Sequence, residues 1–175
     1  MDMRARILRE TRRLAIHSGG IPSLNAVAEA AGVSKGGLIH HFPTRDALVE
    51  GLAREALAEV DEAMTRAATE GRATETWLRL SVPSASDRDL FRALYAAHHA
   101  LNATLTDVMA ESAAAIARWE KLIEAEVGDP VRARLVRLVG DGLAANSMIS
   151  PELTSSDEEI SALTAALLHE PGTPQ

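Results

Sequence analysis

Residues 23–42, SLNAVAEAAGVSKGGLIHHF, hold the side chains whose types and spacing are most suited to a specific chemistry. Two short helices are expected here, over 24–31 and 35–41, joined by a tight turn at Gly32. The second helix keeps a polar outer face that includes glycines, although each glycine costs it about 1 kcal/mol of helix stability. A helix so short buries little area. Its glycines instead indicate a surface that something approaches closely, and in a DNA major groove that would be base edges and phosphates.

The elements that position this stretch are all expected to be helices. Alanine, leucine, arginine and glutamate dominate, aromatic residues make up only 3% of the chain, and alternating β-branched runs are nearly absent. The predicted N-caps are Ser23, Ser34, Thr44 and Asp87. Spacing and breaks predict about nine helices, over 2–18, 24–31, 35–41, 45–69, 75–80, 87–100, 104 or 106 to 127, 131–148 and 157–168. The predicted fold class is therefore all-α.

Charge and composition narrow the class of partner. The 175 residues are 46% hydrophobic and 25% charged, which is typical of a globular chain of one domain or two small ones. Without cysteine there are no disulfides and no thiolate metal sites. Residues 1–50 carry a net charge of +2, although the whole chain carries −7. A basic N-terminal part on an acidic remainder is the asymmetry expected of a chain that binds a polyanion through its N-terminal part. Neither a signal peptide nor a membrane span is expected, so a soluble, cytoplasmic protein is predicted.

With its flanks, the stretch resembles the DNA-binding domain of the TetR family of transcriptional regulators. The similar parts are the ILxxxxxLA pattern of the first helix, the VAEAAGVSKGGLIHHF core, and PTRDALVEGL at the start of the fourth helix. The resemblance implies an N-terminal three-helix helix-turn-helix DNA-binding domain, 1–45. A helical ligand-binding and dimerisation domain, 46–170, and a frayed tail, 171–175, would follow.

The resemblance also implies which residues contact DNA. They are Ser23, Asn25, Ser34, Lys35, Gly36, Gly37, His40, His41, Thr44 and Arg45. Lys35 and the two glycines after it would lie along base edges, while the two histidines would reach backbone phosphates. Adjacent helical residues point about 100° apart, so the histidine pair is not expected to chelate one metal ion.

The ends of two helices carry further implied roles. Ser34 would cap the recognition helix, and the Thr44-Arg45 pair would donate to a phosphate from the start of the fourth helix, where free amides favour anions. Two positions depart from the family pattern. Gly37 stands where threonine or alanine is commoner, and Ile39 stands where tyrosine is commoner. Both changes remove side chains that could contact DNA.

A second group of polar side chains lies near residue 100, each about one helical turn from the next. Tyr95, His98 and Asn102 interrupt a mostly apolar helix, either as satisfied polar groups of a core or as polar handles of a ligand pocket. The predicted ligand-binding residues are Trp77, Phe91, Tyr95, His98, Asn102 and Trp119. No metal, cofactor or catalytic residue is predicted.

The last two long helices carry leucine-rich stripes. These stripes are Leu135, Leu138 and Leu143 on one helix, and Ile160, Leu163 and Leu167 on the other. They could pack within the chain. The family resemblance implies instead a homodimer, whose two recognition helices would read a palindrome.

The function that this pattern favours is a ligand-responsive transcriptional regulator. It would repress from a palindromic operator as a homodimer, and a small-molecule effector would release it. One alternative is a helical interaction protein that does not bind DNA, with Gly37 and Ile39 as signs of decay. A small helical enzyme is the other alternative, but the sequence has no HExxH, GxSxG or phosphate-binding glycine loop, so no enzymatic activity is expected.

Overall fold

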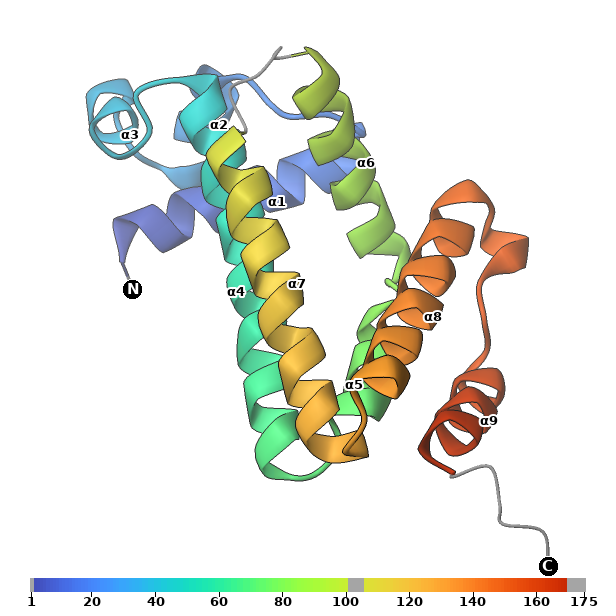
Figure 1. Cartoon of the computed structure of the whole chain (residues 1–175). Helices are drawn as coiled ribbons and strands as arrows, with labels where there is room; N and C mark the ends of the chain where they lie inside the picture. The colour runs from blue at the N-terminus through green and yellow to red at the C-terminus, as the bar shows by residue number, and fades with distance from the viewer. Residues whose placement is uncertain (1, 101–105, 170–175) are drawn as a thin grey trace, which may run out of the picture. The chain divides into compact units, whose positions relative to one another are not determined.

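The computed structural model describes residues 2–100 and 106–169, without the side chains of residues 98–100 and 106. All regular secondary structure in this part of the chain is α-helix or 3₁₀ turn, and no strand occurs in it (Figure 1). This confirms the all-α fold class. The helices are α1 (Met3–Ser18), α2 (Leu24–Ala31), α3 (Lys35–His41), α4 (Arg45–Thr69), α5 (Ala73–Leu80), α6 (Ala85–Ala100), α7 (Thr106–Val127), α8 (Pro130–Ile149) and α9 (Asp157–Leu168), with a 3₁₀ turn η1 (Pro151–Leu153). None of the helices described has the length and apolar character needed to cross a bilayer. The predicted tail lies outside the described residues.

Side-chain caps fix where the short helices near the N-terminus begin. Ser23, Ser34 and Thr44 were each predicted as caps, and each accepts a hydrogen bond from the backbone N–H three residues further on, at 3.0–3.2 Å. Gly19 and Gly32 end α1 and α2 with φ of 68° and 62°. Glycine adopts this left-handed conformation without steric cost, so both helices stop where the sequence predicts.

The predicted cap of α6 is wrong. The helix begins at Ala85, because Ser84 rather than Asp87 is its cap. Ser84 Oγ accepts from the Asp87 N–H at 3.2 Å and donates to the Asp87 carboxylate at 2.6 Å. Asp87 therefore lies in the first turn of α6, where it supports the capping serine.

The chain divides into two compact units, Met1–Leu57 with Ser84–Ser112, and Ala58–Pro83 with Ala113–Gln175. The first unit holds α1, α2, α3, α6 and the first part of α4, and the second holds α5, α8 and α9. These units reflect which parts of the chain pack most densely against each other, and not which parts bind DNA or ligand. The functional boundary predicted after residue 45 stays a prediction.

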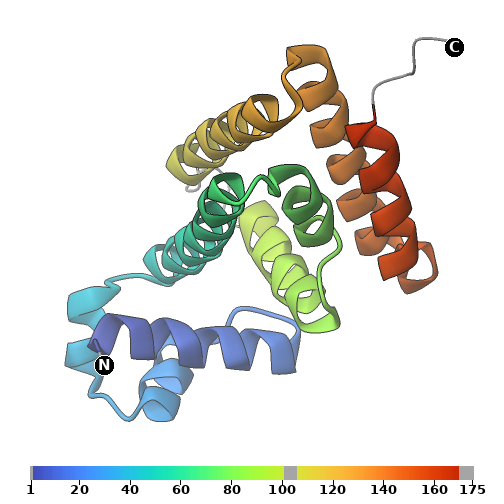
Figure 2. The ribbon, with the colours of Figure 1, turned by 90° about the horizontal axis from the view of Figure 1, so that it is seen from below.

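The first unit has an apolar core, and α4 packs closely against it at Gly51. Its helix α1 packs against α2 and α6 (Figures 1 and 2). A β-carbon at Gly51 would lie 2.7 Å from Cε1 of Phe42 and 3.1 Å from Cδ2 of Leu8, so glycine lets α4 approach that ring. The buried side chains of this core include Ile7, Leu8, Val27, Leu38, Phe42, Leu48, Val49, Leu52 and Leu90.

In the second unit, α5 packs against α8 and α9. A β-carbon at Gly140 of α8 would lie 2.6 Å from Ser81 Oγ and closer still to the indole nitrogen of Trp77. That indole N–H donates to the backbone carbonyl of Arg137 at 3.3 Å. Glycine at this position therefore permits the contact between α5 and α8.

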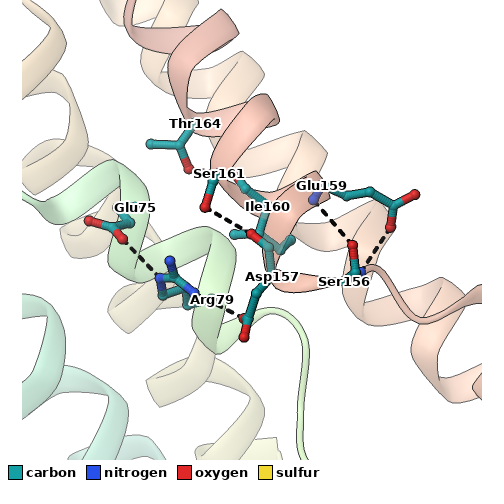
Figure 3. A network of polar contacts seen from close by, with 8 residues as sticks. All are labelled: Glu75, Arg79, Ser156, Asp157, Glu159, Ile160, Ser161 and Thr164. Atoms are coloured by element: carbon teal, nitrogen blue, oxygen red, sulfur yellow. Dashed lines mark hydrogen bonds and ion pairs between the residues drawn. The ribbon is translucent and has the colours of Figure 1, made fainter.

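Polar contacts join α5 to the first turn of α9 (Figure 3). Arg79 of α5 contacts the carboxylates of Glu75 at 2.9 Å and Asp157 at 3.1 Å. At the start of α9, Ser156 and Glu159 form a capping box, in which each side chain bonds to the other residue's backbone N–H. The start of α9 is thus defined by its own cap and by an ion pair to α5.

Candidate nucleic-acid interface

Helix α3 exposes one side and buries the other. Leu38 is fully buried, whereas Lys35, Gly36, Ile39 and His40 are exposed. At 100° per residue, Gly36 and His40 lie almost opposite Leu38, and Ile39 lies beside them. The structure thus exposes the side of α3 that the sequence predicts to face DNA.

A tight turn sets α3 at an angle to α2. The N–H of Gly32 donates to the carbonyl of Glu29 at 3.1 Å, and the N–H of Val33 donates to the carbonyl of Ala28 at 3.0 Å. These two bonds satisfy the last carbonyls of α2 and reverse the chain direction. Because α2 also packs against α3, the two helices form a helix-turn-helix.

The two glycines of α3 differ in their surroundings. A β-carbon at Gly37 would lie 3.3 Å from Oγ of Ser34, the capping atom, and 4.0 Å from Sδ of Met3. A β-carbon at Gly36 would meet no atom within 4 Å. The cap therefore favours glycine at position 37, while nothing in the described fold requires it at position 36.

The neighbouring histidines point in different directions. His40 is exposed and His41 is half-buried, and their rings meet edge to face with centroids 5.3 Å apart and planes at 74°. Each can present a nitrogen to a separate acceptor. Within the described residues, no three His, Cys, Asp or Glu side chains are grouped so as to hold a metal ion.

The start of α4 lies against the segment that leads into α2. Thr44 caps α4, and Nη2 of Arg45 donates to the carbonyl of Ile21 at 2.6 Å. The rest of the Arg45 guanidinium still carries donors that can reach a phosphate. Ser23 and Asn25 lie exposed at the start of α2. The predicted DNA-contacting residues are thus gathered on three consecutive helices of the first unit.

Arg4 is a candidate contact that the sequence interpretation did not single out. Its guanidinium carbon lies 5.3 Å from the centroid of the Phe42 ring, within the range of a cation–π contact. Met3 lies close to Gly37, so the first turn of α1 runs beside α3. The basic character of the N-terminus was the only signal for Arg4, because its position depends on the packing of α1.

The predicted ligand-binding tryptophans contact each other in the second unit. The ring centroids of Trp77 and Trp119 are 5.8 Å apart, and both side chains are buried. The Trp77 N–H is bonded to Arg137, as described above, and the Trp119 N–H donates to the Asp61 carboxylate at 2.9 Å.

The other four predicted ligand-binding residues lie in the first unit or outside the described residues. Phe91 and Tyr95 belong to the first unit, on α6, where their side chains are 39% and 66% exposed. The side chain of His98 and the whole of Asn102 lie outside the described residues. Of the six, the described structure brings together the two tryptophans.

A shallow groove of about 530 Å³ runs between α4 and α7 in the second unit. It is lined by Asp61, Thr65, Ala117, Arg118, Lys121 and Leu122, none of which the sequence interpretation named. Hydrogen bonds from Arg118, at 2.7 Å, and from Trp119 hold the pKa of the Asp61 carboxyl below its ordinary value. Asp61 thereby joins the wall of the groove to the tryptophan pair.

Two family models match the chain. The model of bacterial regulatory proteins of the tetR family matches residues 7–52, and the model of a tetracyclin repressor-like C-terminal domain matches residues 71–170. The chain belongs to the TetR family. It is therefore a transcriptional regulator with a helix-turn-helix DNA-binding domain and a C-terminal domain of the family's ligand-binding type.

Solved structures of similar fold cover nearly the whole TetR-family chain. A member of the TetR family (SCO1917) from Streptomyces coelicolor A3 has 25% identity and a TM-score of 0.67, over 95% of this chain and 98% of its own. GusR of Salmonella enterica has 19% identity and a TM-score of 0.62, over 94% and 93%. The multidrug binding protein EbrR, solved with imidazole, has 23% identity and a TM-score of 0.60, over 99% and 98%. The last two show a shared fold. No curated protein sequence matches.

Helix α8 of this TetR-family regulator has two apolar sides. Val131, Leu135, Leu138 and Ile149 are exposed, with exposed fractions of 50–76%. Leu143, predicted to share a stripe with Leu135 and Leu138, is instead buried on the opposite side with Ala133, Val136, Gly140 and Ser147. Ile160 of the α9 stripe is also buried, whereas Leu163 and Leu167 are half-buried. The predicted stripes thus mix residues of the core with residues of the surface.

Proposed function

We propose that this TetR-family chain is a homodimeric repressor that binds a palindromic operator through α3 and leaves it when a small effector binds. The observation that carries the proposal is the exposed side of α3, opposite the buried Leu38, with Lys35 and His40 on or beside it. A polar, capped helix that follows a tight turn has the form of a groove-reading element.

The contacts to DNA are proposed to divide by chemistry. Lys35 and the glycines beside it would face base edges, and His40 and His41 would reach phosphates on either side of the groove. Thr44 and Arg45 would hold a phosphate at the start of α4, where the free backbone N–H groups of a 25-residue helix add favourable charge. Ser23, Asn25 and Ser34 complete the set that the family resemblance implies.

The dimer is proposed to form through α8 and α9. Exposed apolar side chains recur along one side of α8, at Val131, Leu135, Leu138 and Ile149, and large exposed apolar surfaces mark interfaces. A twofold partner would bury this side against its own copy and present two α3 helices to one duplex. Two heads spaced by about 34–36 Å, one helical turn of DNA, would then read an inverted repeat.

The effector is proposed to bind the helical body and to act by population shift. A ligand that favours a body conformation with the wrong spacing of the heads lowers DNA affinity by the coupling free energy. The six predicted residues, Trp77, Phe91, Tyr95, His98, Asn102 and Trp119, remain the proposed contacts. Since the chain has two tryptophans and they contact each other, their fluorescence would report binding in this region.

Selection from a pool of duplexes with a randomised centre tests the proposal. We expect the purified chain to enrich an inverted repeat, and Lys35→Ala to lose most of that enrichment. Lys121→Ala is a matched control, because Lys121 is the only other lysine of the chain and lies exposed on α7 in the second unit. If the chain retained no duplex in preference to the random pool, the result would instead favour a helical interaction protein that does not bind DNA.

A further inference from the structure

The exposed side of α3 carries one large apolar side chain. Ile39 is 39% exposed, and between residues 4 and 79, all of which the structure describes, no other large apolar residue is counted as exposed. The neighbouring apolar residue of α3, Leu38, is fully buried. Met3, at the start of α1 beside Gly37, is also exposed, so Ile39 is the one large apolar side chain exposed on the helix-turn-helix itself, residues 24–41.

Gly36 leaves open space next to Ile39. The two residues are three apart on a helix, so they are neighbours on one side of α3. A β-carbon at Gly36 would meet no atom within 4 Å, and its backbone is not left-handed, so the fold gives no reason for a glycine that weakens the helix. Gly37 differs, because a β-carbon there would crowd the capping hydroxyl of Ser34 at 3.3 Å. The space over Gly36 is therefore available to a partner that approaches the backbone closely.

The chemistry of this surface matches one feature of the major groove. Thymine is the base that presents a methyl group there, and apolar side chains recognise it by contact. Lys35 and His40, which flank Ile39 on the exposed side, supply donors for the polar edges and phosphates around such a methyl group. A protein partner would instead be expected to require a larger exposed apolar patch than one isoleucine.

We infer that Ile39 is a specificity-determining residue, which contacts the C5 methyl group of a thymine in each half of the operator, and that Gly36 provides the room for this approach. The inference rests on the proposed function, because it assumes that α3 lies in a major groove.

Replacing thymine by uracil tests the contact, because uracil lacks only the methyl group. The probe is the duplex enriched from the randomised pool, with each thymine replaced in turn. At one thymine per half-site, we expect uracil to weaken binding by wild type about fourfold per half-site, the value of one buried methyl group. Ile39→Ala should bind the thymine duplex more weakly than wild type and should not distinguish it from the uracil duplex. Where cytosine is substituted for that thymine, 5-methylcytosine should recover part of the lost affinity.

The outcomes separate failure of the contact from failure of the proposed function. If wild type enriches a duplex but no uracil replacement weakens binding, or if the uracil effect persists in Ile39→Ala, the inference is overturned and the proposed function stands. If no duplex is enriched, both fail. Gly36→Ala adds an independent readout, since it should raise the thermal midpoint of the protein and still weaken duplex binding. Unchanged binding by Gly36→Ala would contradict the role given to the open space.

Discussion

Arg45, the first residue of α4, donates a hydrogen bond from Nη2 to the backbone carbonyl of Ile21, at 2.6 Å. Ile21 lies in the segment between α1 and α2 and is itself buried, with 8% of its surface exposed. This single bond links the start of α4 to the lead-in of the helix-turn-helix within the first unit. A residue predicted only as a phosphate contact thus also has a structural partner.

Arg45→Ala is predicted to have two separable effects. Loss of the bond to Ile21 should lower the free energy of unfolding by about 1 kcal/mol, which denaturant titration measures. Loss of one phosphate contact per protomer should also reduce the slope of log affinity against log salt by about 0.9 per protomer, or about 1.8 per dimer. Arg13→Ala, which removes an exposed cation paired with Glu10 on α1, is the control for both effects. A stable variant with an unchanged salt slope would show that Arg45 has neither role.

Gly51→Ala is predicted to destabilise the chain although alanine is the better helix former. The added methyl group would lie 2.7 Å from Phe42 Cε1, so the ring must move, and such overpacking costs about 1–3 kcal/mol. Gly36→Ala is the matched control, because it adds the same methyl group in open space and should stabilise by about 1 kcal/mol. Thermal unfolding of the two variants should therefore shift in opposite directions, and a rise in both midpoints would be inconsistent with close packing of α4 on Phe42.

Asp61 is predicted to make stability depend on acid pH. Hydrogen bonds from Arg118 and Trp119 lower the pKa of its carboxyl, so the folded state binds the proton less readily than the unfolded state. The resulting stability is present above the ordinary pKa of an aspartate and is lost as the pH falls through the lowered value in the folded chain. Since the Asp61 side chain is 40% exposed, solvent screening limits its contribution to less than about 1 kcal/mol.

Denaturant titration between neutral pH and about pH 3 measures this contribution. On acidification, the free energy of unfolding of Asp61→Asn should fall less than that of wild type. Glu62→Gln, which removes a carboxylate in a more exposed pair with Arg66 on the same helix, is the control and should follow wild type closely. Parallel curves for wild type and Asp61→Asn would rule out the role given to this carboxylate.

Leu135→Glu with Leu138→Glu is predicted to prevent dimer formation. Both side chains are 50% exposed on α8, so the acids can be hydrated in the monomer but would repel across a twofold interface. Sedimentation velocity should show a dimer for wild type and a monomer for the double variant, with helical circular dichroism unchanged. Met109→Glu, at an apolar position of α7 that is 56% exposed, is the control and should remain dimeric. A double variant that still sediments as a dimer would place the interface elsewhere.

Local signals in the sequence were enough to predict most of the helices. Ser23, Ser34 and Thr44 cap the helices they were predicted to cap, because an N-cap depends on residues within one turn. The same rule failed at α6, where Ser84 and Asp87 could each begin the helix. Their mutual hydrogen bonds, which the sequence does not show, decided between them.

Packing across the fold could not be predicted in the same way. At 100° per residue, Leu143 lies about 140° from Leu138, so the three leucines do not share one stripe, and the position of α5 decides which side of α8 is buried. Arg4 was missed for a related reason. Its place beside α3 follows from its contact with the Phe42 ring, which lies 38 residues further along the chain.

The central claim is that the exposed side of α3 binds duplex DNA. Its most direct test is the dissociation constant of the enriched duplex for wild type, Lys35→Ala and Lys121→Ala over a range of salt concentrations. The account predicts that Lys35→Ala binds about tenfold or more weakly at each salt concentration, the loss of one specific contact, while Lys121→Ala follows wild type. Coinciding curves for Lys35→Ala and wild type would contradict it.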